Sequence, residues 1–445
     1  MLKITCEGVY YKNGGFVPAK DGPAAGLPAP EKAREGTMAH AILKAHNTGD
    51  NMEELAIRFD AMASHDITYV GIIQTARASG MQAFPLPYVL TNCHNSLCAV
   101  GGTINEDDHV FGLSAAKKYG GEFVPAHQSV IHSYMRERYA APGRMILGSD
   151  SHTRYGAYGT MAIGEGGPEL ARQLLSKTYN IPYPKVIAIY LTGTPIPGVG
   201  PQDVALELIR STFKDGVVKN AVMEFFGPGV ANLSMDYRSG IDVMTTETTC
   251  LSSIWPADHT LKAHLAVLGR GEAFKPQAPA DGAYYDGLIE VELDKIRPMI
   301  ALPFHPSNAY TIQEFQENLD ELLHQVDEDT VRQLKLKNRP ASLREKIVDG
   351  KFRVDQGVIA GCSGGTYQNI VRAAQILDGR RHRLRRVLAV GLSHQPARQP
   401  GADPEGLYRL PHGRRRLYPL LLLRPLLRRG RRARQRGFLH PSLHP

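Results

Sequence analysis

The chain has 445 residues, 42% of them apolar, and a formal net charge of +8 at pH 7. This length suits two to four domains, the apolar fraction is typical of a globular protein, and no run of about 18 apolar residues predicts a membrane span. The N-terminal residues lack the apolar segment of a signal peptide, and five cysteines without a C-x-x-C pair argue against a disulfide framework. We therefore expect a protein of a reducing compartment, the cytoplasm, that does not insert into membranes.

The positive charge lies at the C-terminal end. Residues 380–445 contain 17 arginines, no lysine and two acidic residues, so they carry +15 and leave −7 for residues 1–379. Hydrophobic periodicity stops after Gly379, and the composition beyond it resembles GC-rich codons read out of frame. We interpret residues 380–445 as an Arg-rich, non-native tail. The alternative is a basic arm for nucleic acid, a partner that we do not expect because lysine is absent and stacking aromatic residues are scarce.

The first part of the chain predicts helices and strands in alternation. Residues 1–36 are rich in glycine and proline and are expected to form loops. Thr37 is a candidate N-cap for a helix that ends near His46. The next elements are expected, in chain order, as a strand at 84–90 and a helix at 113–119, followed by a segment at 130–139 that carries His132.

The most informative segment begins with a predicted strand at 145–147. It runs into Gly148-Ser149-Asp150-Ser151-His152 and a glycine-rich stretch, and a helix is expected to begin near Pro168. Open α/β sheets bind ligands at the carboxyl ends of their strands, and an acid, a hydroxyl and an imidazole in consecutive positions suit proton transfer there. The structural alternative is a helix N-cap, for which Asp and Ser are preferred.

The second part continues the α/β pattern. We expect strands at 185–191 and 289–293, a helix near 204–209 and a long helix at 312–331. A strand at 358–360 is predicted to lead into Gly361-Cys362-Ser363-Gly364 and a helix that reaches Leu377. A cysteine in such a turn suits a metal or cluster ligand, and the alternative is a buried structural cysteine.

Taken in order, these motifs resemble the aconitase family over about residues 30 to 379. The family's signature segments are matched by Gly148–Thr153, Ala162–Gly167, Gly227–Val230 and Gly361–Gly364, and Thr37–Ala39 and Leu191–Gly193 fit as well. The resemblance implies a hydro-lyase that acts on a hydroxy-polycarboxylic acid, with this small molecule as its partner. It also implies a [4Fe-4S] cluster held by three cysteine thiolates, whose open iron acts as a Lewis acid.

The resemblance further implies an α/β fold of three aconitase-like α/β/α domains. They are expected at 31–190, 191–305 and 306–379, after an N-terminal extension at 1–30. The third domain is expected to be incomplete, and the swivelling C-terminal domain of the family is not expected in this sequence.

The resemblance lets the roles of the family's site residues be carried over to the matching positions of this sequence. The resemblance assigns His94 to the family's acid, His132 and Glu247 to a histidine–carboxylate pair near the open iron, and Asp150 and His152 to holding water or hydroxide. Substrate contacts fall to Ser151, for a carboxylate, and to His65, which stands at a substrate-binding glutamine of the family. Cys362 matches the first cluster ligand.

The departures from the family predict an inactive chain. Cys93 replaces the aspartate that orients the catalytic histidine, and Asp242 and Val243 replace two polar residues of the family's motif. The C-G-P-C pair that supplies the other two thiolates does not occur in the sequence, nor do the substrate-binding arginines and the serine base. We therefore expect no stable cluster and no activity in the chain as written.

Two alternatives to the family enzyme are kept. One is a mononuclear metal hydrolase that uses His94, His132, Asp150 and His152, although none of these residues stands in an H-x-x-x-H pattern. The other is a non-catalytic binding protein, with the basic tail as its contact for nucleic acid.

Overall fold

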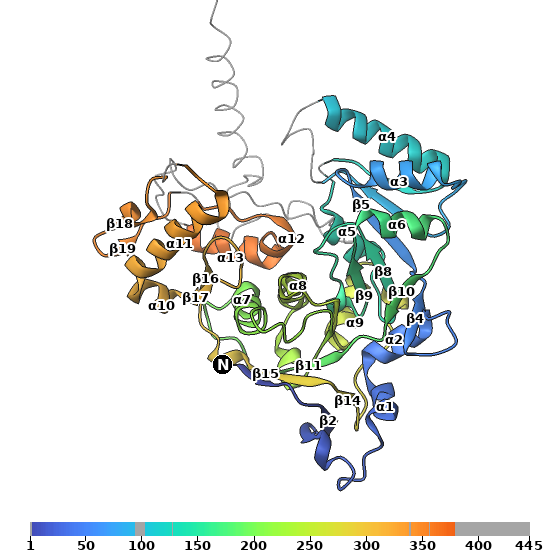
Figure 1. The fold of residues 1–445 in the computed structure, drawn as a ribbon, viewed down its shortest axis with the longest axis horizontal. Coiled ribbons are helices and arrows are strands. Elements are labelled where there is room, and N and C mark those ends of the chain that lie inside the picture. The colour runs from blue at the N-terminus through green and yellow to red at the C-terminus, as the bar shows by residue number, and fades with distance from the viewer. Residues whose placement is uncertain (1, 94–102, 127, 338–339, 356, 379–445) are drawn as a thin grey trace, which may run out of the picture. The chain divides into compact units, whose positions relative to one another are not determined.

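The computed structural model describes residues 2–93, 103–126, 128–337, 340–355 and 357–378. They divide into two compact units, one that ends at Phe352 and one that begins at Arg353. Parallel sheets covered by helices make up most of the first unit, so the predicted α/β class is confirmed (Figure 1).

The first sheet has five strands, and all its strand pairs are parallel. Its order is β7 (Glu122–Val124), β6 (Tyr88–Thr91), β5 (Ala61–His65), β8 (Met145–Gly148) and β9 (Met161–Gly164). Because parallel strands end at the same edge of a sheet, the residues that follow β5 and β8 are neighbours.

Helices cover both faces of this sheet (Figure 1). On one face, Met62 of β5 shares a core with α3 (Tyr69–Ala78), α4 (Thr103–Tyr119) and α6 (Gly167–Leu174). On the other face, Ala61 and Ala63 share a core with α5 (Ile131–Arg138). Burial on both sides explains why β5, β6 and β8 are apolar along most of their length rather than alternating.

The second sheet is also mainly parallel. Its order is β1 (Leu2–Thr5), β15 (Gly287–Glu292), β11 (Val186–Thr192), β12 (Val222–Phe226) and β13 (Ser252–Ile254), with β1 antiparallel to β15. Core residues of this sheet pack with α7 (Pro201–Thr212), α8 (Met235–Met244) and α9 (His259–Val267). The two sheets meet where β13 contacts β9. The predicted domain border near residue 190 falls inside β11, and the borders stay predictions.

Shorter elements complete the first unit. The helices are α1 (Pro30–Ala33), α2 (Met38–His46), α10 (Ile312–Glu317) and α11 (Leu319–Leu334). The paired strands are β2 (Val9–Lys12) with β3 (Gly15–Pro18) and β14 (Tyr284–Tyr285), β4 (Glu54–Ile57) with β10 (Tyr179–Pro182), β16 (Met299–Ala301) with β17 (Ala309–Thr311), and β18 (Ile347–Val348) with β19 (Lys351–Phe352).

Several local predictions are confirmed and others are wrong. Thr37 caps α2 by accepting the backbone N–H of His40 at 3.1 Å, and β11, α6 and β15 form close to the expected bounds. The loop expected at 1–36 is wrong. β1 and β2 pair with β15 and β14, which lie too far away in sequence to be read locally, whereas β2 and β3 form a local hairpin around Asn13 and Gly14. The long helix at 312–331 is instead two helices that meet at Asn318.

The second unit is described over residues 353–355 and 357–378. It contains α12 (Gly361–Gly364) and α13 (Tyr367–Leu377). No strand forms at 358–360, so that prediction is wrong within the part of this unit that is described. Cys362 is half-buried and lies in α12, just ahead of α13, so the predicted turn before a helix is present.

A buried carboxylate joins β12 to the start of α2. Glu224 is fully buried, and its oxygens accept the backbone N–H groups of Met38 (3.1 Å) and Ala39 (2.9 Å) and the hydroxyl of Tyr285 (2.7 Å). Burial raises the pKa of Glu224 to about 7. The first amides of a helix have no partner within the helix, so this carboxylate satisfies donors that would otherwise be buried without an acceptor.

We expect Glu224→Ala to lower the free energy of unfolding by about 2 to 4 kcal/mol, because it leaves buried donors without an acceptor. Tyr285→Phe is the matched control and should cost about 1 kcal/mol, since it removes one donor and leaves no group unsatisfied except one lone pair. Urea unfolding, followed by the fluorescence of the buried Trp255, measures both. Equal costs would show that Glu224 does not hold the helix start.

The raised pKa of Glu224 predicts that the free energy of unfolding depends on pH. Its pKa in the folded chain is raised above the unfolded value, so its protonated form is favoured by folding, and stability falls as pH rises from about 4.5 through 7. Glu224→Gln cannot ionise and should flatten this part of the profile. A wild-type stability that rises over this range relative to the glutamine variant would contradict the raised pKa.

Candidate active site

Five of the predicted site residues meet at the carboxyl ends of β5 and β8. His65 is the last residue of β5, and Asp150 and His152 lie in the turn that follows β8. His132 comes from the first turn of α5, and Glu247 comes from η5 (Thr245–Thr248), a 3-10 helix directly after α8. The pairing of β5 with β8 therefore brings together residues that are up to 87 positions apart in sequence.

The turn after β8 is shaped by Asp150. Its Oδ1 accepts the backbone N–H of His152 at 2.7 Å, and its carbonyl oxygen accepts the hydroxyl of Thr153 at 2.7 Å. A Cβ atom on Gly164 would lie 2.4 Å from that carbonyl oxygen, so this position needs glycine. The alternative of a helix N-cap at Asp150 is wrong, because the next α-helix begins only at Gly167.

Asp150 is surrounded by three imidazoles. Its Oδ1 lies 3.1 Å from Nε2 of His132 and 3.6 Å from Nδ1 of His152, and its Oδ2 lies 3.5 Å from Nε2 of His65. The side chains of His65, His132 and Asp150 are nearly buried, whereas that of His152 is 34% exposed. The carboxylate thus holds the three rings around one point at the edge of the sheet.

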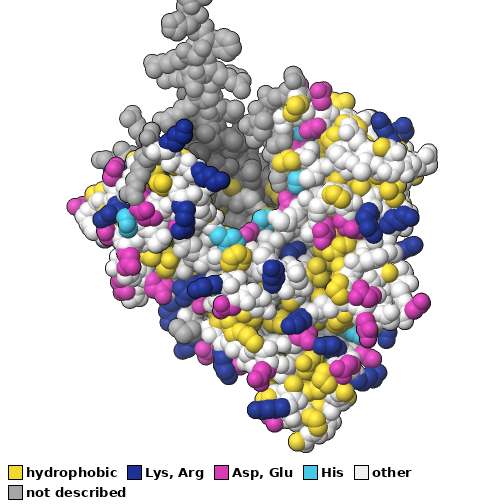
Figure 2. All heavy atoms as spheres, viewed as in Figure 1, with side chains coloured by type: hydrophobic (Ala, Val, Ile, Leu, Met, Phe, Trp, Pro, Cys, Tyr) yellow, Lys and Arg dark blue, Asp and Glu magenta, His cyan; other side chains and the backbone are white. Residues whose placement is uncertain are grey.

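Glu247 faces His152 from the other side. Its Oε1 lies 3.2 Å from Nε2 of His152, so the two nitrogens of this imidazole face two different carboxylates. The hydroxyl of Thr246 donates to the carbonyl of Ser151 at 2.6 Å and ties η5 to the turn after β8. Figure 2 shows histidine side chains close to acidic ones at the surface, over the part of the molecule where Figure 1 labels α8.

His132 and His152 are held in opposite protonation states. Burial lowers the pKa of His132 to about 4, against the opposing effect of Asp150. Hydrogen bonds to Asp150 and Glu247 raise the pKa of His152 to about 9. At pH 7 the first ring is therefore neutral and the second is protonated, an arrangement typical of sites that perform general acid–base chemistry.

The neutral ring of His132 has a defined tautomer. Nε2 faces the carboxylate of Asp150, which can only accept, so Nε2 carries the proton. Nδ1 then accepts the hydroxyl of the buried Tyr155, 3.2 Å away. The ring is fixed at both nitrogens and is oriented for its contact with Asp150.

Of the other three predicted residues, only Ser151 is described within the first unit. Ser151 is exposed, and its hydroxyl lies 3.5 Å from Nδ1 of His152, which leaves it accessible to a ligand. His94 lies outside the described residues. Cys362 belongs to the second unit, so its assignment as a cluster ligand stays a prediction.

His305 also lies at this site and was not predicted from the sequence. This residue lies in the loop between β16 and β17, and its Nε2 is 3.8 Å from Oε2 of Glu247. No motif surrounds it, and its only local signal is a loop flanked by Pro303 and Pro306. It reaches the site because η5 contacts the end of α7, where Phe213 stacks on the ring of His305 with centroids 4.0 Å apart.

The described residues do not fit a [4Fe-4S] cluster. Cys250 is buried, and its Sγ donates to the carbonyl of Thr245 at 3.3 Å. Cys93 lies with its Sγ 3.6 Å from the hydroxyl of Thr91, and Cys6 is exposed beyond β1. Among the described residues, no group of three or more His, Cys, Asp or Glu side chains is arranged to hold a metal ion.

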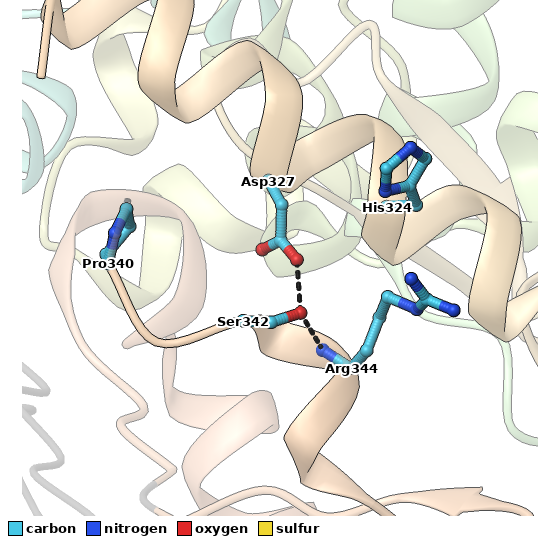
Figure 3. A pocket seen from close by; sticks show the side chains of 5 residues that line it. All are labelled: His324, Asp327, Pro340, Ser342 and Arg344. Atoms are coloured by element: carbon cyan, nitrogen blue, oxygen red, sulfur yellow. Dashed lines mark hydrogen bonds between the residues drawn. The ribbon is translucent and has the colours of Figure 1, made fainter. Parts of the chain in front are cut away.

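A separate hollow of about 170 Å³ is lined by His324, Asp327, Pro340, Ser342 and Arg344 (Figure 3). The carboxylate of Asp327 accepts the hydroxyl of Ser342, whose oxygen accepts the backbone N–H of Arg344 at 3.1 Å. The guanidinium of Arg344 pairs with Asp320 at 2.7 and 2.8 Å. These contacts cap the 3-10 helix η8 (Leu343–Lys346), so we attribute a structural role to them.

We expect Glu247→Gln to lower the pKa of His152 from about 9 to a value between that and 6.5, because one of its two carboxylate partners loses its charge. The raised pKa contributes stability that is present below about pH 6.5 and is lost as pH rises to about 9, and the variant should lose part of it. NMR titration of the imidazole, assigned with His152→Gln, measures the shift. The exposed Glu54→Gln is the control, and an unchanged pKa in Glu247→Gln would contradict the geometry.

Comparison with known proteins places these residues in a family. A sequence model of the aconitase family (aconitate hydratase) matches residues 40–399, so the match extends past residue 380, where the non-native tail was expected to begin. The mitochondrial aconitate hydratase of Schizosaccharomyces pombe is 30% identical over 340 residues, which cover 72% of this chain and 39% of that protein.

Two further relatives give similar values. The probable mitochondrial aconitate hydratase of Dictyostelium discoideum is 28% identical over 76% of this chain and 44% of its own length. The mitochondrial aconitate hydratase of Saccharomyces cerevisiae is 27% identical over 79% of this chain and 45% of its own. The chain thus spans less than half the length of these relatives. None of its described helices is both long and apolar enough to cross a membrane. From the extent of the family match, we conclude that the chain belongs to the aconitase family.

Proposed function

We propose that the site binds a hydroxy-polycarboxylic acid and belongs to a hydro-lyase of the aconitate hydratase type. The observation that carries this proposal is the pair of imidazoles on Asp150, one neutral and one protonated at pH 7. Elimination of water needs a proton for the departing hydroxyl, because hydroxide is a poor leaving group. The relatives named as aconitate hydratases support the same class of reaction.

We assign a role to each described residue of the site. The imidazolium of His152 places a positive charge beside the hydroxyl or water at the reacting carbon, and Asp150 and Glu247, which face its two nitrogens, hold that ring in place. The hydroxyl of Ser151, which is exposed beside His152, binds a substrate carboxylate. His65 and His132 line the buried side of Asp150, and Glu247 keeps His152 protonated. The role of acid that the resemblance gives to His94 stays a prediction.

The cofactor and the location are also proposals. A [4Fe-4S] cluster, where bound, supplies a Lewis acid for the hydroxyl. Cys362 would supply one thiolate, and the described cysteines of the first unit are occupied with other contacts or exposed. We therefore propose that these 445 residues alone hold no stable cluster and are inactive. We propose a cytoplasmic location, although the relatives are named as mitochondrial proteins, and cell fractionation would decide between the two.

Ligand binding tests the proposed substrate class without requiring turnover. We expect citrate to shift the imidazole NMR signals of His152 and His132, because its hydroxyl and carboxylates contact the group around Asp150. Tricarballylate, which is citrate without the hydroxyl, is the matched control and should bind about tenfold more weakly. Asp150→Asn should abolish the difference between the two. If no hydroxy-polycarboxylate shifts these signals at millimolar concentration, the proposed substrate class is wrong.

Anaerobic reconstitution tests the proposed lack of a cluster. Incubation of the full chain with iron and sulfide should leave far less than one cluster per chain, because a cubane needs about three thiolates and only Cys362 matches a ligand position. Iron and sulfide analysis with visible absorbance measures the yield, and Cys362→Ser is the control. A stoichiometric cluster that is lost in Cys362→Ser would show that the chain supplies the other ligands after all.

A further inference from the structure

His305 is held firmly in its loop. Its ring stacks on Phe213, with centroids 4.0 Å apart and an interplanar angle of 27°. Its Nδ1 lies 3.1 Å from the backbone nitrogen of Ser307 and 2.9 Å from the hydroxyl of the same residue. Contacts to the ring face and to one ring nitrogen leave Nε2 with a fixed direction.

These contacts also define which nitrogen carries the proton. The backbone N–H of Ser307 can only donate, so Nδ1 accepts it and the neutral ring carries its proton on Nε2. Nε2 faces Oε2 of Glu247 at 3.8 Å, an electrostatic contact longer than a hydrogen bond. The Nε2–H group of His305 therefore directs its partial positive charge toward the carboxylate of Glu247.

The carboxylate of Glu247 has a contact on each of its two oxygens. Its side chain is 26% exposed and extends from a 3-10 helix of four residues, so these polar contacts act together with packing to set its direction. One oxygen faces Nε2 of His152 and the other faces Nε2 of His305. The carboxylate thus lies between two imidazoles, of which only the one of His152 also contacts Asp150.

We propose that His305 is a positioning residue of this site, which holds the carboxylate of Glu247 against the imidazole of His152. The inference rests on the proposed function for its link to catalysis, because the reaction assigned above uses His152. The placement of Glu247 itself does not depend on which substrate the site takes. His305 acts through Glu247 and is not expected to contact the substrate.

The alternative is a purely structural role, in which the ring of His305 only packs against Phe213. Its ring covers Phe213, and loss of that stacking alone could destabilise the loop between β16 and β17. Phenylalanine at position 305 keeps an aromatic ring for stacking and removes the N–H. Glutamine at the same position gives up the stacking but places an amide N–H near the original Nε2. The two substitutions therefore separate the packing role from the positioning role.

The test reads the imidazole of His152 by NMR in the full chain. The charged and titratable groups that face this ring are Asp150, Glu247 and the ring of His132, whose centroid lies 6.4 Å away. We expect His305→Phe to lower the pKa of His152 by about half of the drop caused by Glu247→Gln, and to speed solvent exchange of its Nε2–H about threefold. His305→Gln should leave both close to wild type.

The outcomes separate the two roles. A pKa of His152 that stays unchanged or rises in His305→Phe would overturn the proposal, as would a drop of the same size in His305→Gln. A lowered melting temperature in His305→Gln with normal His152 titration in both variants would assign His305 to packing alone. The readout needs no turnover, so it remains valid if citrate binding fails and the proposed substrate class is wrong.

Discussion

The site depends on one carboxylate, that of Asp150, which serves three imidazoles and the backbone of its own turn. Oδ1 accepts the N–H of His152 and the ring of His132, while Oδ2 faces His65. Charge-assisted contacts of this kind are stronger than those between neutral groups, and they fix direction as well as distance. Without this acceptor, three ring nitrogens would lose their common partner at the point where two adjacent strands end.

The fold supplies that point through parallel pairing. β5 and β8 end at the same edge, so His65 and the turn after β8 converge although 79 residues separate the two strands. Glycine at position 164 lets β9 pass close to the carbonyl of Asp150, and α5 covers the buried side with His132. The buried strands β5 and β8 thus hold the polar turn in which Asp150 and His152 lie.

Much of this arrangement could be predicted from the sequence, and the reasons for the failures are physical. Asp150 and His152 follow an apolar strand that ends at Gly148, and a glycine-rich stretch follows them. This local pattern indicates a turn that binds a ligand. β1 was missed because it forms by pairing with β15, which lies almost 300 residues away, whereas the hairpin of β2 and β3 has a local signal, the Asn13-Gly14 turn, that was overlooked. His305 was missed for the same reason as β1, since its place in the site comes from packing between α7 and η5 rather than from any motif near it.

The polar side chains around the site either support it from within the core or contact its carboxylates. Asp242 stands in the motif that ends at Glu247, yet its Oδ1 accepts the hydroxyl of Ser253 (2.7 Å) and the indole N–H of Trp255 (3.0 Å), and the side chain is fully buried. It therefore supports the wall behind the site and does not face a ligand. At His65 and His305, by contrast, imidazoles meet the two carboxylates that control His152. In the described residues the polar lining of the site thus consists mainly of imidazoles and carboxylates. The proton held on His152 is then governed by how firmly Asp150 and Glu247 are kept beside it, which makes the neighbours of these carboxylates as important as the carboxylates themselves.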